Sequence, residues 1–298
     1  MAVNPVVTQA NKGKLVTSTG FGGYDYCVNP YVGCQFGCTY CYVRFFIKDK
    51  NEKWGDFVRT RDHMRTKIDK DLQYIAAGER LVIGTMTDPY QPIERKYRLT
   101  RTLLEAIKKA PKPPKSVGLF TRSPIVMDDL QLIKDTDTRI HITITPYDLD
   151  VLTRIEPIAI GINKRFWIAQ ALVNAGVKVH ISVSPVMPYS DKHIKTFAKK
   201  IANICPTGFT VDPMQAYGEA FDATDAALQG DPDWPAIRKL IKDKKAWKAW
   251  KQQHGADWIA EWQQYKHLPV FAISMDHQKQ TRINMVTGAK FDHKDFDY

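Results

Sequence analysis

Short apolar runs rich in β-branched residues alternate with stretches of helical periodicity over the first two-thirds of the chain. The runs that predict strands are 24–29, 80–85, 116–121, 139–145, 177–184 and 208–212. The patterns that predict helices are 61–77, 98–110, 125–134, 163–175 and 190–203. Strands that alternate with helices indicate parallel βαβ units, whose ligand site lies at the carboxyl ends of the strands. Six such units fit a partial barrel or an open doubly wound sheet, and periodicity alone does not choose between them.

The pattern changes at both ends of this region. Residues 1–23 are expected to be irregular, and a helical, basic, tryptophan-rich segment covers 231–266. Within it, 238–251 carry seven Lys or Arg against one Asp. The tryptophans at helical spacing are Trp247, Trp250, Trp258 and Trp262. Such a face favours packing against the rest of the protein, whereas the lysines suit phosphates and an exposed ring suits a nucleobase.

Composition narrows the class of protein. With 298 residues, 44% of them hydrophobic and 25% charged, the chain is typical of a globular protein with one large or two ordinary domains. No apolar run approaches the ~20 residues that span a bilayer, and the first residues lack the layout of a signal peptide. We therefore expect a cytoplasmic protein without a membrane partner. The formal net charge of +11 favours polyanionic partners, nucleic acid first, although a solvated basic surface explains it as well.

Three of the five cysteines, Cys34, Cys38 and Cys41, lie within eight positions with the spacing C-x3-C-x2-C. An odd number of cysteines without an export signal favours metal or redox use over disulfides. A zinc site needs four ligands, usually as two close pairs, and the second pair is missing. An iron–sulfur cluster takes thiolates from short runs of this kind, and three thiolates on four irons leave one iron open for chemistry. Cys27 and Cys205 are expected to be small buried residues.

This spacing, with Tyr40 directly before the last cysteine, resembles the signature of radical SAM (S-adenosylmethionine) enzymes. The segments NPYVGCQFGCTYCYVR, IGTMTDPYQPIE and HITIT…EP…KR…ALVNAGVKVHISVSPVMP are similar to the branch related to spore photoproduct lyase. The resemblance covers roughly residues 20–215. It implies an α/β fold, a partial (β/α)6 barrel of radical SAM type over 24–215, between the irregular segment 1–23 and a basic helical extension over 216–298.

The same resemblance implies the cofactors. A 4Fe-4S cluster would be held by Cys34, Cys38 and Cys41, and SAM would chelate the fourth iron through its amino and carboxylate groups. One electron, from a donor such as flavodoxin or ferredoxin, would then cleave SAM to methionine and a 5′-deoxyadenosyl radical. The protein would supply orientation and exclude side reactions.

Contacts to SAM are expected at the ends of the strands. The predicted SAM-binding residues are Tyr40, Thr87, Asp88, Arg122, Thr143, Ser184 and Met187. Tyr40, Ser184 and Met187 are expected near the adenine. Thr87 and Asp88 suit the methionine amino group or the ribose, and Arg122 can clamp the carboxylate.

Simpler interpretations stay open for these positions. Tyr40 and Met187 can serve in packing, and Thr87 with Asp88 can form a turn or a helix cap. Alternating threonines such as Thr143 are ordinary in strands, and a surface salt bridge would account for Arg122. Glu94 is expected only as a structural partner of a basic residue.

One position departs from spore photoproduct lyase, which ends its repair reaction with a cysteine that donates a hydrogen atom. Aligning the Thr-Ser-Asp that follows that cysteine with Met86, Thr87 and Asp88 puts Thr85 in its place. A threonine O–H bond is too strong to give a hydrogen atom to a carbon radical. A rearrangement needs no such donor, so a nucleobase isomerisation or hypermodification fits better than repair.

The sequence therefore predicts a radical SAM enzyme that modifies or rearranges a thymine-derived nucleobase in DNA. Three alternatives remain: an enzyme of this kind acting on a peptide or small metabolite, a repair lyase that uses Cys27 or Tyr42 as hydrogen donor, and a zinc-stabilised nucleic-acid-binding protein without catalytic activity.

Overall fold

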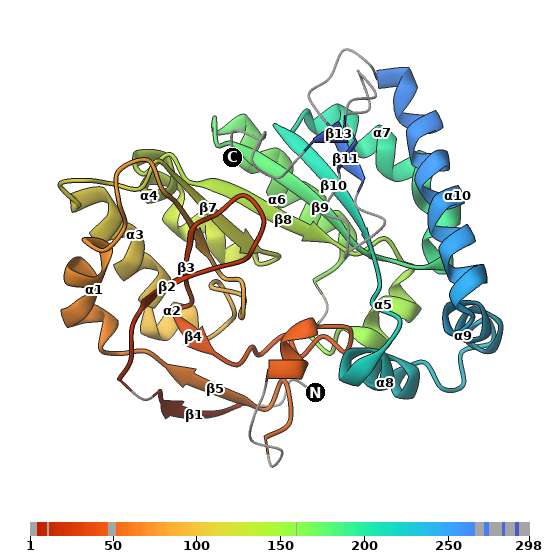
Figure 1. Ribbon diagram of the computed structural model, residues 1–298, viewed down its shortest axis with the longest axis horizontal. Helices are drawn as coiled ribbons and strands as arrows, with labels where there is room; N and C mark the ends of the chain where they lie inside the picture. Colours follow the sequence, from red (N-terminus) through yellow and green to blue (C-terminus); the bar gives the residue numbers. More distant parts are fainter. Residues whose placement is uncertain are drawn as a thin grey trace.

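A computed structural model describes residues 5–10, 12–46, 52–158, 160–265, 271–273, 282–283 and 290–291. Its centre is an eight-stranded sheet in the order β11-β10-β9-β8-β7-β6-β3-β2 (Figure 1). The strands of this sheet are β2 (Val16–Ser18), β3 (Tyr26–Val28), β6 (Arg80–Ile83), β7 (Ser116–Thr121), β8 (Arg139–Ile144), β9 (Val179–Val186), β10 (Gly208–Pro213) and β11 (Phe271–Ile273). All neighbours pair in parallel except β2, which lies antiparallel to β3 at one edge.

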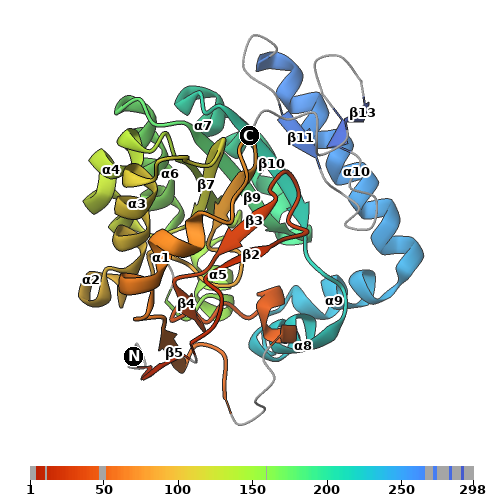
Figure 2. The same ribbon diagram turned by 60° about the vertical axis from the view of Figure 1, so that its left-hand side comes forward.

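Helices cover the outer face of this sheet (Figure 2). The helices between the strands are α1 (Met64–Leu72), α2 (Glu94–Tyr97), α3 (Leu99–Lys109), α4 (Leu130–Asp135), α5 (Leu149–Ile155), α6 (Ile162–Asn174) and α7 (Ile194–Ile204). The 3-10 helices η1 (Tyr42–Phe46), η2 (Pro124–Asp129) and η3 (Pro188–His193) join them. Central strands read as continuous buried runs, such as Leu81–Ile83, because a parallel sheet covered by helices faces water on neither side.

This architecture confirms the predicted α/β fold with a mostly parallel sheet. The six predicted strands correspond to β3 and to β6 through β10, and each of the five predicted helical stretches contains a helix. Their strong periodicity comes from burial, since one continuous apolar core lies between the sheet and its helices.

The N-terminal segment is not irregular as expected. β1 (Val6–Gln9) and β2 are strands, and β1 belongs to a second sheet in the order β1-β5-β4, with β5 (Phe57–Thr60) and β4 (Tyr31–Val32). Every side chain of β1 is exposed, so the strand has no apolar alternation by which the sequence could reveal it. Its pairing with β5 is what defines it.

The chain after β10 forms three helices, α8 (Gly218–Ala227), α9 (Trp234–Lys242) and α10 (Lys244–Trp262). The predicted helical segment 231–266 is thus divided at Asp243, whose Oδ1 accepts hydrogen bonds from the N–H groups of Lys245 (2.9 Å) and Ala246 (3.0 Å) and so caps α10. The short 3-10 helix η4 (Gln263–Tyr265) follows, and β12 (Arg282–Ile283) and β13 (Lys290–Phe291) pair antiparallel further on.

Helix α10 lies beside α7, as the next helix of the outer layer (Figure 1). The rings of Trp258 and Trp262 lie against Phe209 of β10, with centroid distances of 5.8 and 4.4 Å. After α10 the chain returns to the sheet as β11, parallel to β10. The predicted boundary at 215/216 therefore falls between β10 and the helix that packs on it, and the division into separate domains stays a prediction.

A second buried cluster joins this C-terminal region to the barrel loops. Tyr147, Met187 and Met214 from the strand ends pack with residues of α8, α9 and α10 that include Phe221, Trp234 and Trp247. The packing interpretation is thus confirmed for Trp247, Trp258 and Trp262, which are all at least nine-tenths buried. Trp250 is half-buried and stacks on Trp247 at a centroid distance of 4.7 Å.

Two minor expectations are wrong. Glu94 does not pair with a basic residue: its carboxylate accepts hydrogen bonds from the Tyr31 hydroxyl and from the N–H groups of Thr100 and Arg101, at the start of α3. Cys205 is exposed, because it ends α7 in the left-handed conformation with φ 54°. Within the described residues, no helix is both long and apolar enough to cross a lipid bilayer.

Candidate active site

The three clustered cysteines lie in the loop between β4 and η1, at the carboxyl end of the parallel strands. Cys34 and Cys38 are buried and Cys41 is partly exposed. The loop begins at Gly33 with φ 88°, where an added Cβ would lie 2.5 Å from the Phe57 carbonyl oxygen. Only glycine fits this position without moving β5.

Polar side chains from the loop after β6 fix the cysteine loop. Thr87 Oγ1 donates to the Gly33 carbonyl (2.6 Å), and Gln91 Nε2 donates to Thr87 Oγ1 (2.9 Å). Gln91 Oε1 also accepts from the N–H of Gln35 (2.8 Å). Thr87 therefore holds the loop that carries the cysteines, an interaction that the sequence did not predict.

A cavity of about 290 Å³ opens beside this loop. Nine of the ten predicted site residues line it: Cys34, Cys38, Cys41, Tyr40, Thr87, Asp88, Arg122, Thr143 and Ser184. They come from the cysteine loop and from the ends of β6, β7, β8 and β9, as expected for parallel strands that end at one edge. The structure does not bring Met187 to the cavity, because it is wholly buried in the cluster with Tyr147 and Trp234.

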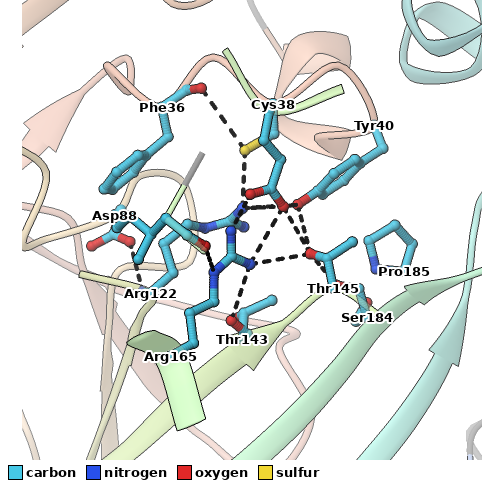
Figure 3. A network of polar contacts seen from close by, with 12 residues as sticks. Phe36, Cys38, Tyr40, Asp88, Arg122, Thr143, Thr145, Arg165, Ser184 and Pro185 are labelled. Atoms are coloured by element: carbon cyan, nitrogen blue, oxygen red, sulfur yellow. Dashed lines mark hydrogen bonds and ion pairs between the residues drawn. The ribbon is translucent and has the colours of Figure 1, made fainter. Parts of the chain in front are cut away.

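Arg122 lies at the centre of a buried polar network (Figure 3). Its Nη1 lies 3.1 Å from Cys38 Sγ, 2.8 Å from the Tyr40 hydroxyl and 2.9 Å from Glu156 Oε1. Because Arg122 is largely buried, the surface salt bridge considered from sequence is wrong. Its Nε and Nη2 have no hydrogen-bond partner among the described residues, and such a pair of N–H groups matches a carboxylate.

Glu156 holds this network together, although the sequence alone assigned it no role. Its carboxylate accepts from Arg165 Nη2, from the Tyr40 hydroxyl and from Thr145 Oγ1 (2.7 Å). Burial alone would raise the pKa of Glu156, but Arg165 and Arg122 outweigh it and lower the pKa to about 2. Glu156 therefore carries a negative charge that balances part of the two buried guanidinium charges.

A signal for this pair was present in the chain. Glu156 and Arg165 are the E and the R of the EP…KR stretch that carried part of the resemblance. Arg165 is fully buried on α6, which brings it to the end of β8. Other cavity residues that sequence reasoning missed are Ser182, Asp212 and Gln215 at the ends of β9 and β10.

Asp88 is committed to local structure. It accepts hydrogen bonds from Thr121 Oγ1 (2.7 Å), from the N–H of Arg122 (3.0 Å) and from the N–H of Tyr90 (2.9 Å). The hydrogen bond from Tyr90 closes a turn at Asp88, which is the structural alternative that the sequence allowed for this residue. Burial raises the pKa of Asp88, and these donors partly offset the effect. A direct contact of Asp88 with a cofactor stays a prediction.

The donor set of the loop fits a 4Fe-4S cluster. Each thiolate binds a different iron in such a cluster, so the three sulfurs surround it and need not converge on one atom. Consistently, no three Cys, His, Asp or Glu side chains in the described part of the chain are grouped to hold a single metal ion. Burial raises the pKa of all three thiols, that of Cys41 to about 12, so cluster assembly has to displace their protons.

The indole N–H of Trp54 adds to this fit. It is buried, packs in the same apolar cluster as Cys34 and Cys38, and has no partner among the described residues. A buried donor without an acceptor is costly, and a sulfide ion would supply the acceptor.

Solved structures of known proteins share the fold of this chain. The chain resembles solved structures of spore photoproduct lyase, including a variant with bound dinucleoside spore photoproduct, with a TM-score of 0.64 over 87% of this chain and 78% of that chain at 14% identity. It also resembles anSMEcpe with bound AdoMet, with a TM-score of 0.53 and 11% identity over 83% of this chain and 60% of the other.

Among curated sequences, an uncharacterized protein of Methanocaldococcus jannaschii is 30% identical over 177 residues, which are 59% of this chain and 65% of that protein. An uncharacterized protein of Mycobacterium tuberculosis (strain H37Rv) is 26% identical over 207 residues, or 65% of this chain and 60% of that protein. The matched region thus spans less than two-thirds of either relative.

The model of the radical SAM superfamily matches residues 28–201, which include the three cysteines, Arg122, Glu156 and Arg165. Members of this superfamily use a 4Fe-4S cluster and SAM. With its cysteine loop, its strand-end cavity and more than half of its length matched, this chain belongs to the radical SAM superfamily.

Proposed function

We propose that this radical SAM enzyme modifies or rearranges a thymine-derived nucleobase in DNA. The observation that carries the proposal is Thr85, which lines the cavity at the place where the resemblance puts the hydrogen-donating cysteine of spore photoproduct lyase. Its hydroxyl accepts a hydrogen bond from Asn29 Nδ2 (3.2 Å). Among the described residues that line the cavity, the thiols are those of the three cluster cysteines. The site therefore suits a reaction that needs no thiol donor.

The fold supports the choice of substrate. The solved structures that resemble this chain include a lyase with a bound dinucleoside photoproduct, and the net charge of +11 favours a polyanionic partner. The cavity wall combines aromatic rings, such as Phe36 and Phe120, with hydroxyl groups of Thr143 and Ser182. A planar base with polar edges matches such a wall.

When bound, the cluster and SAM would supply a 5′-deoxyadenosyl radical, which is able to remove a hydrogen atom from carbon. The side chains of the protein bind the cofactors and fix their orientation. Cys34, Cys38 and Cys41 would hold three irons, and the Nε and Nη2 groups of Arg122 would hold the SAM carboxylate. Glu156 fixes Arg122 and Tyr40 through hydrogen bonds, so the position of both is set before substrate arrives.

Anaerobic reconstitution with iron, sulfide, SAM and reductant tests the proposal. Thymine-containing DNA should stimulate 5′-deoxyadenosine formation, and mass spectrometry of the digested DNA should reveal an altered or isomeric thymine. DNA of the same length without thymine is the matched control. Stimulation by peptides or small metabolites in place of DNA would contradict the substrate class.

Solvent deuterium separates rearrangement from repair. A rearrangement returns to the product the hydrogen that was taken from the substrate, so product formed in D₂O should carry no carbon-bound deuterium. A donor with an exchangeable proton would place deuterium on carbon.

Tyr42 is the residue that favours a repair lyase as second candidate. It lines the cavity, and its hydroxyl donates to the carbonyl oxygen of Thr85. Cys27, the other donor considered from sequence, does not line the cavity; its thiol lies 3.3 Å from Thr17 Oγ1. If DNA that contains thymine dimers is repaired with uptake of deuterium, and Tyr42→Phe stops the uptake, repair replaces rearrangement.

The basic face of α9 and α10 is expected to bind phosphates. Lys244, Lys245 and Lys248 are exposed and have no acidic partner among the described residues. Replacing all three by glutamine should weaken DNA binding and flatten the plot of log affinity against log salt concentration, by up to about 0.9 for each phosphate that is no longer neutralised. Fluorescence anisotropy at several salt concentrations measures both.

The matched control replaces Lys70, Lys109 and Lys112, exposed lysines in and after α1 and α3 on the far side of the molecule (Figure 1). An equal loss of slope in both triple variants would show that the α10 lysines have no special role.

A further inference from the structure

Exposed aromatic side chains gather around the mouth of the cavity. Phe21 and Tyr42 line the cavity and are still 36% and 37% exposed, so they lie where it opens to solvent. Phe45 and Phe46 follow on η1 and are 74% and 56% exposed. We call these four residues, together with Tyr217, the aromatic rim.

The rings of η1 form a continuous series that begins inside the cavity. Phe46 packs edge-to-face on Tyr42 at a centroid distance of 6.4 Å, and Phe45 packs edge-to-face on Phe46 at 5.6 Å. Each ring thus keeps a neighbour on one side and meets solvent on another. The series leads from a cavity-lining residue to the open surface.

Tyr217 is a further exposed aromatic residue, on the segment that follows β10. It is 69% exposed and lies two residues after the cavity-lining Gln215, directly before α8. Helix α8 packs against η1, and the two lie side by side in Figures 1 and 2. Tyr217 therefore lies on the segment that leads from the cavity to α8, the helix that contacts η1.

This grouping is not the ordinary scatter of apolar groups on a surface. Ten large hydrophobic side chains are exposed among the described residues, and the five of the rim are half of them. All five are aromatic, whereas the other five include Val6, Val7 and Leu149. Exposed apolar groups that cluster at a cavity mark a binding surface, and planar rings are what stacking requires.

We propose that the aromatic rim is a subsite on which the nucleobases that flank the reacting base stack. The proposal rests on the proposed function, because it specifies how the DNA strand is held at the same site. A base that enters the cavity has to leave its own stack, and its neighbours lose a stacking partner. Exposed rings beside the mouth replace that partner for any base, since every base has a π face.

The charges around the rim favour bases over phosphates at this place. Helix α8 presents the exposed carboxylates of Glu219 and Asp222 next to the rim, and these repel phosphate groups. Arg44 of η1 is partly buried and feels the charge of Glu219, whereas a group of exposed lysines lies further along the chain, on α9 and α10. A strand whose bases face the rim can keep its phosphates away from α8 and toward these lysines.

The position of the rim also favours substrate over a protein electron donor. A substrate that extends out of the cavity on the side of η1 passes over Phe21 and Tyr42, because both line the cavity and reach solvent. A reductase seated on the same rings would close the entrance while substrate was needed inside.

Binding of a labelled single-stranded dT12 to the cluster-loaded protein, without reductant, tests the subsite. Phe45→Ala, Phe46→Ala and Tyr217→Ala should each weaken binding about tenfold. The slope of log affinity against log salt concentration should stay unchanged, because the same phosphates remain neutralised. Phe46→Trp should retain affinity and Phe46→Leu should not, since leucine is apolar but cannot stack.

The controls are Tyr74→Ala and Trp167→Ala, which remove aromatic rings that are 63% and 52% exposed elsewhere. Iron content and visible absorbance confirm that each variant is folded and loaded. Equal affinity of the rim variants and the wild type would overturn the subsite. So would unchanged dT12 binding combined with slower cluster reduction by flavodoxin, which would assign the rim to a protein donor.

The outcomes separate the subsite from the proposed function. A wild-type protein that binds no dT12 and forms no product from thymine DNA contradicts both. A wild-type protein that forms product, with rim variants that bind dT12 equally well, contradicts the subsite alone.

Discussion

Replacing Cys34, Cys38 or Cys41 by alanine is expected to abolish both the brown colour of the protein and its cleavage of SAM. With one thiolate missing, one iron loses its protein ligand, and the cluster that leaves a single iron open for SAM no longer forms. Iron and sulfide content, the visible spectrum, and the yield of 5′-deoxyadenosine after anaerobic reconstitution measure the effect. All four quantities should fall to the level of the unreconstituted protein.

Cys27→Ala and Cys205→Ala are the matched controls. Cys27 lies in β3 outside the cavity lining, and Cys205 lies at the exposed end of α7. Both variants should keep colour and SAM cleavage. A cluster that survives the loss of any one cysteine of the loop would contradict the assignment of its ligands.

Glu156→Gln is expected to lower the free energy of unfolding by about 3–5 kcal/mol, the usual cost when one partner of a buried ion pair is removed. Glutamine keeps the size of the side chain but not the charge, so Arg122 and Arg165 would remain buried without a carboxylate. Urea unfolding of the cluster-free protein, followed by tryptophan fluorescence, measures the change. Glu105→Gln, an exposed carboxylate on α3, should change stability by less than about 0.5 kcal/mol.

The loss of unfolding free energy in Glu156→Gln should become smaller at low pH. The pKa of Glu156 is about 2 in the folded protein and its ordinary value is 4.5. The folded state therefore binds this proton less readily than the unfolded chain, and the carboxylate stabilises the fold fully above about pH 4.5. This contribution decreases as the pH falls from 4.5 towards 2, so the difference between wild type and Glu156→Gln should shrink over the same range. A difference that stays constant with pH would contradict the ion-pair explanation.

Glu156→Gln should also weaken SAM binding, because Arg122 Nη1 would lose its charged partner. Equilibrium binding of SAM to the cluster-loaded variant tests this separately from stability. Unchanged affinity would show that the orientation of Arg122 does not depend on Glu156.

The sequence predicted those parts of the fold that depend on burial. The strands from β6 to β10 were recognisable because residues such as Leu81 and Ile181 lie in a sheet covered by helices, so their apolar runs are continuous. β1 and β5 were not: every side chain of β1 is exposed, β5 is buried but only four residues long, and each depends on a partner about 50 residues away. Local pattern carries no information about such pairing.

The residues of the site also fall into those that the sequence predicted and those that it did not. The cysteines and the strand-end residues follow from spacing and from the geometry of parallel strands. The roles of Glu156 and Arg165 do not follow from spacing, because they depend on contact in space with Arg122, which lies more than 30 residues earlier in the chain. Met187 was misplaced because it follows β9, directly before η3, where its side chain packs in the cluster with Trp234 and not in the cavity.

The cluster that joins Tyr147 and Met187 to Trp234 and Trp247 has a consequence for biosynthesis. The ribosome releases the barrel strands first, while the helices that cover these side chains are still to be translated. At about 5–20 residues per second, a nascent chain would wait for seconds between completing β10 and completing α10. During that interval the apolar side chains at the strand ends remain accessible to chaperones.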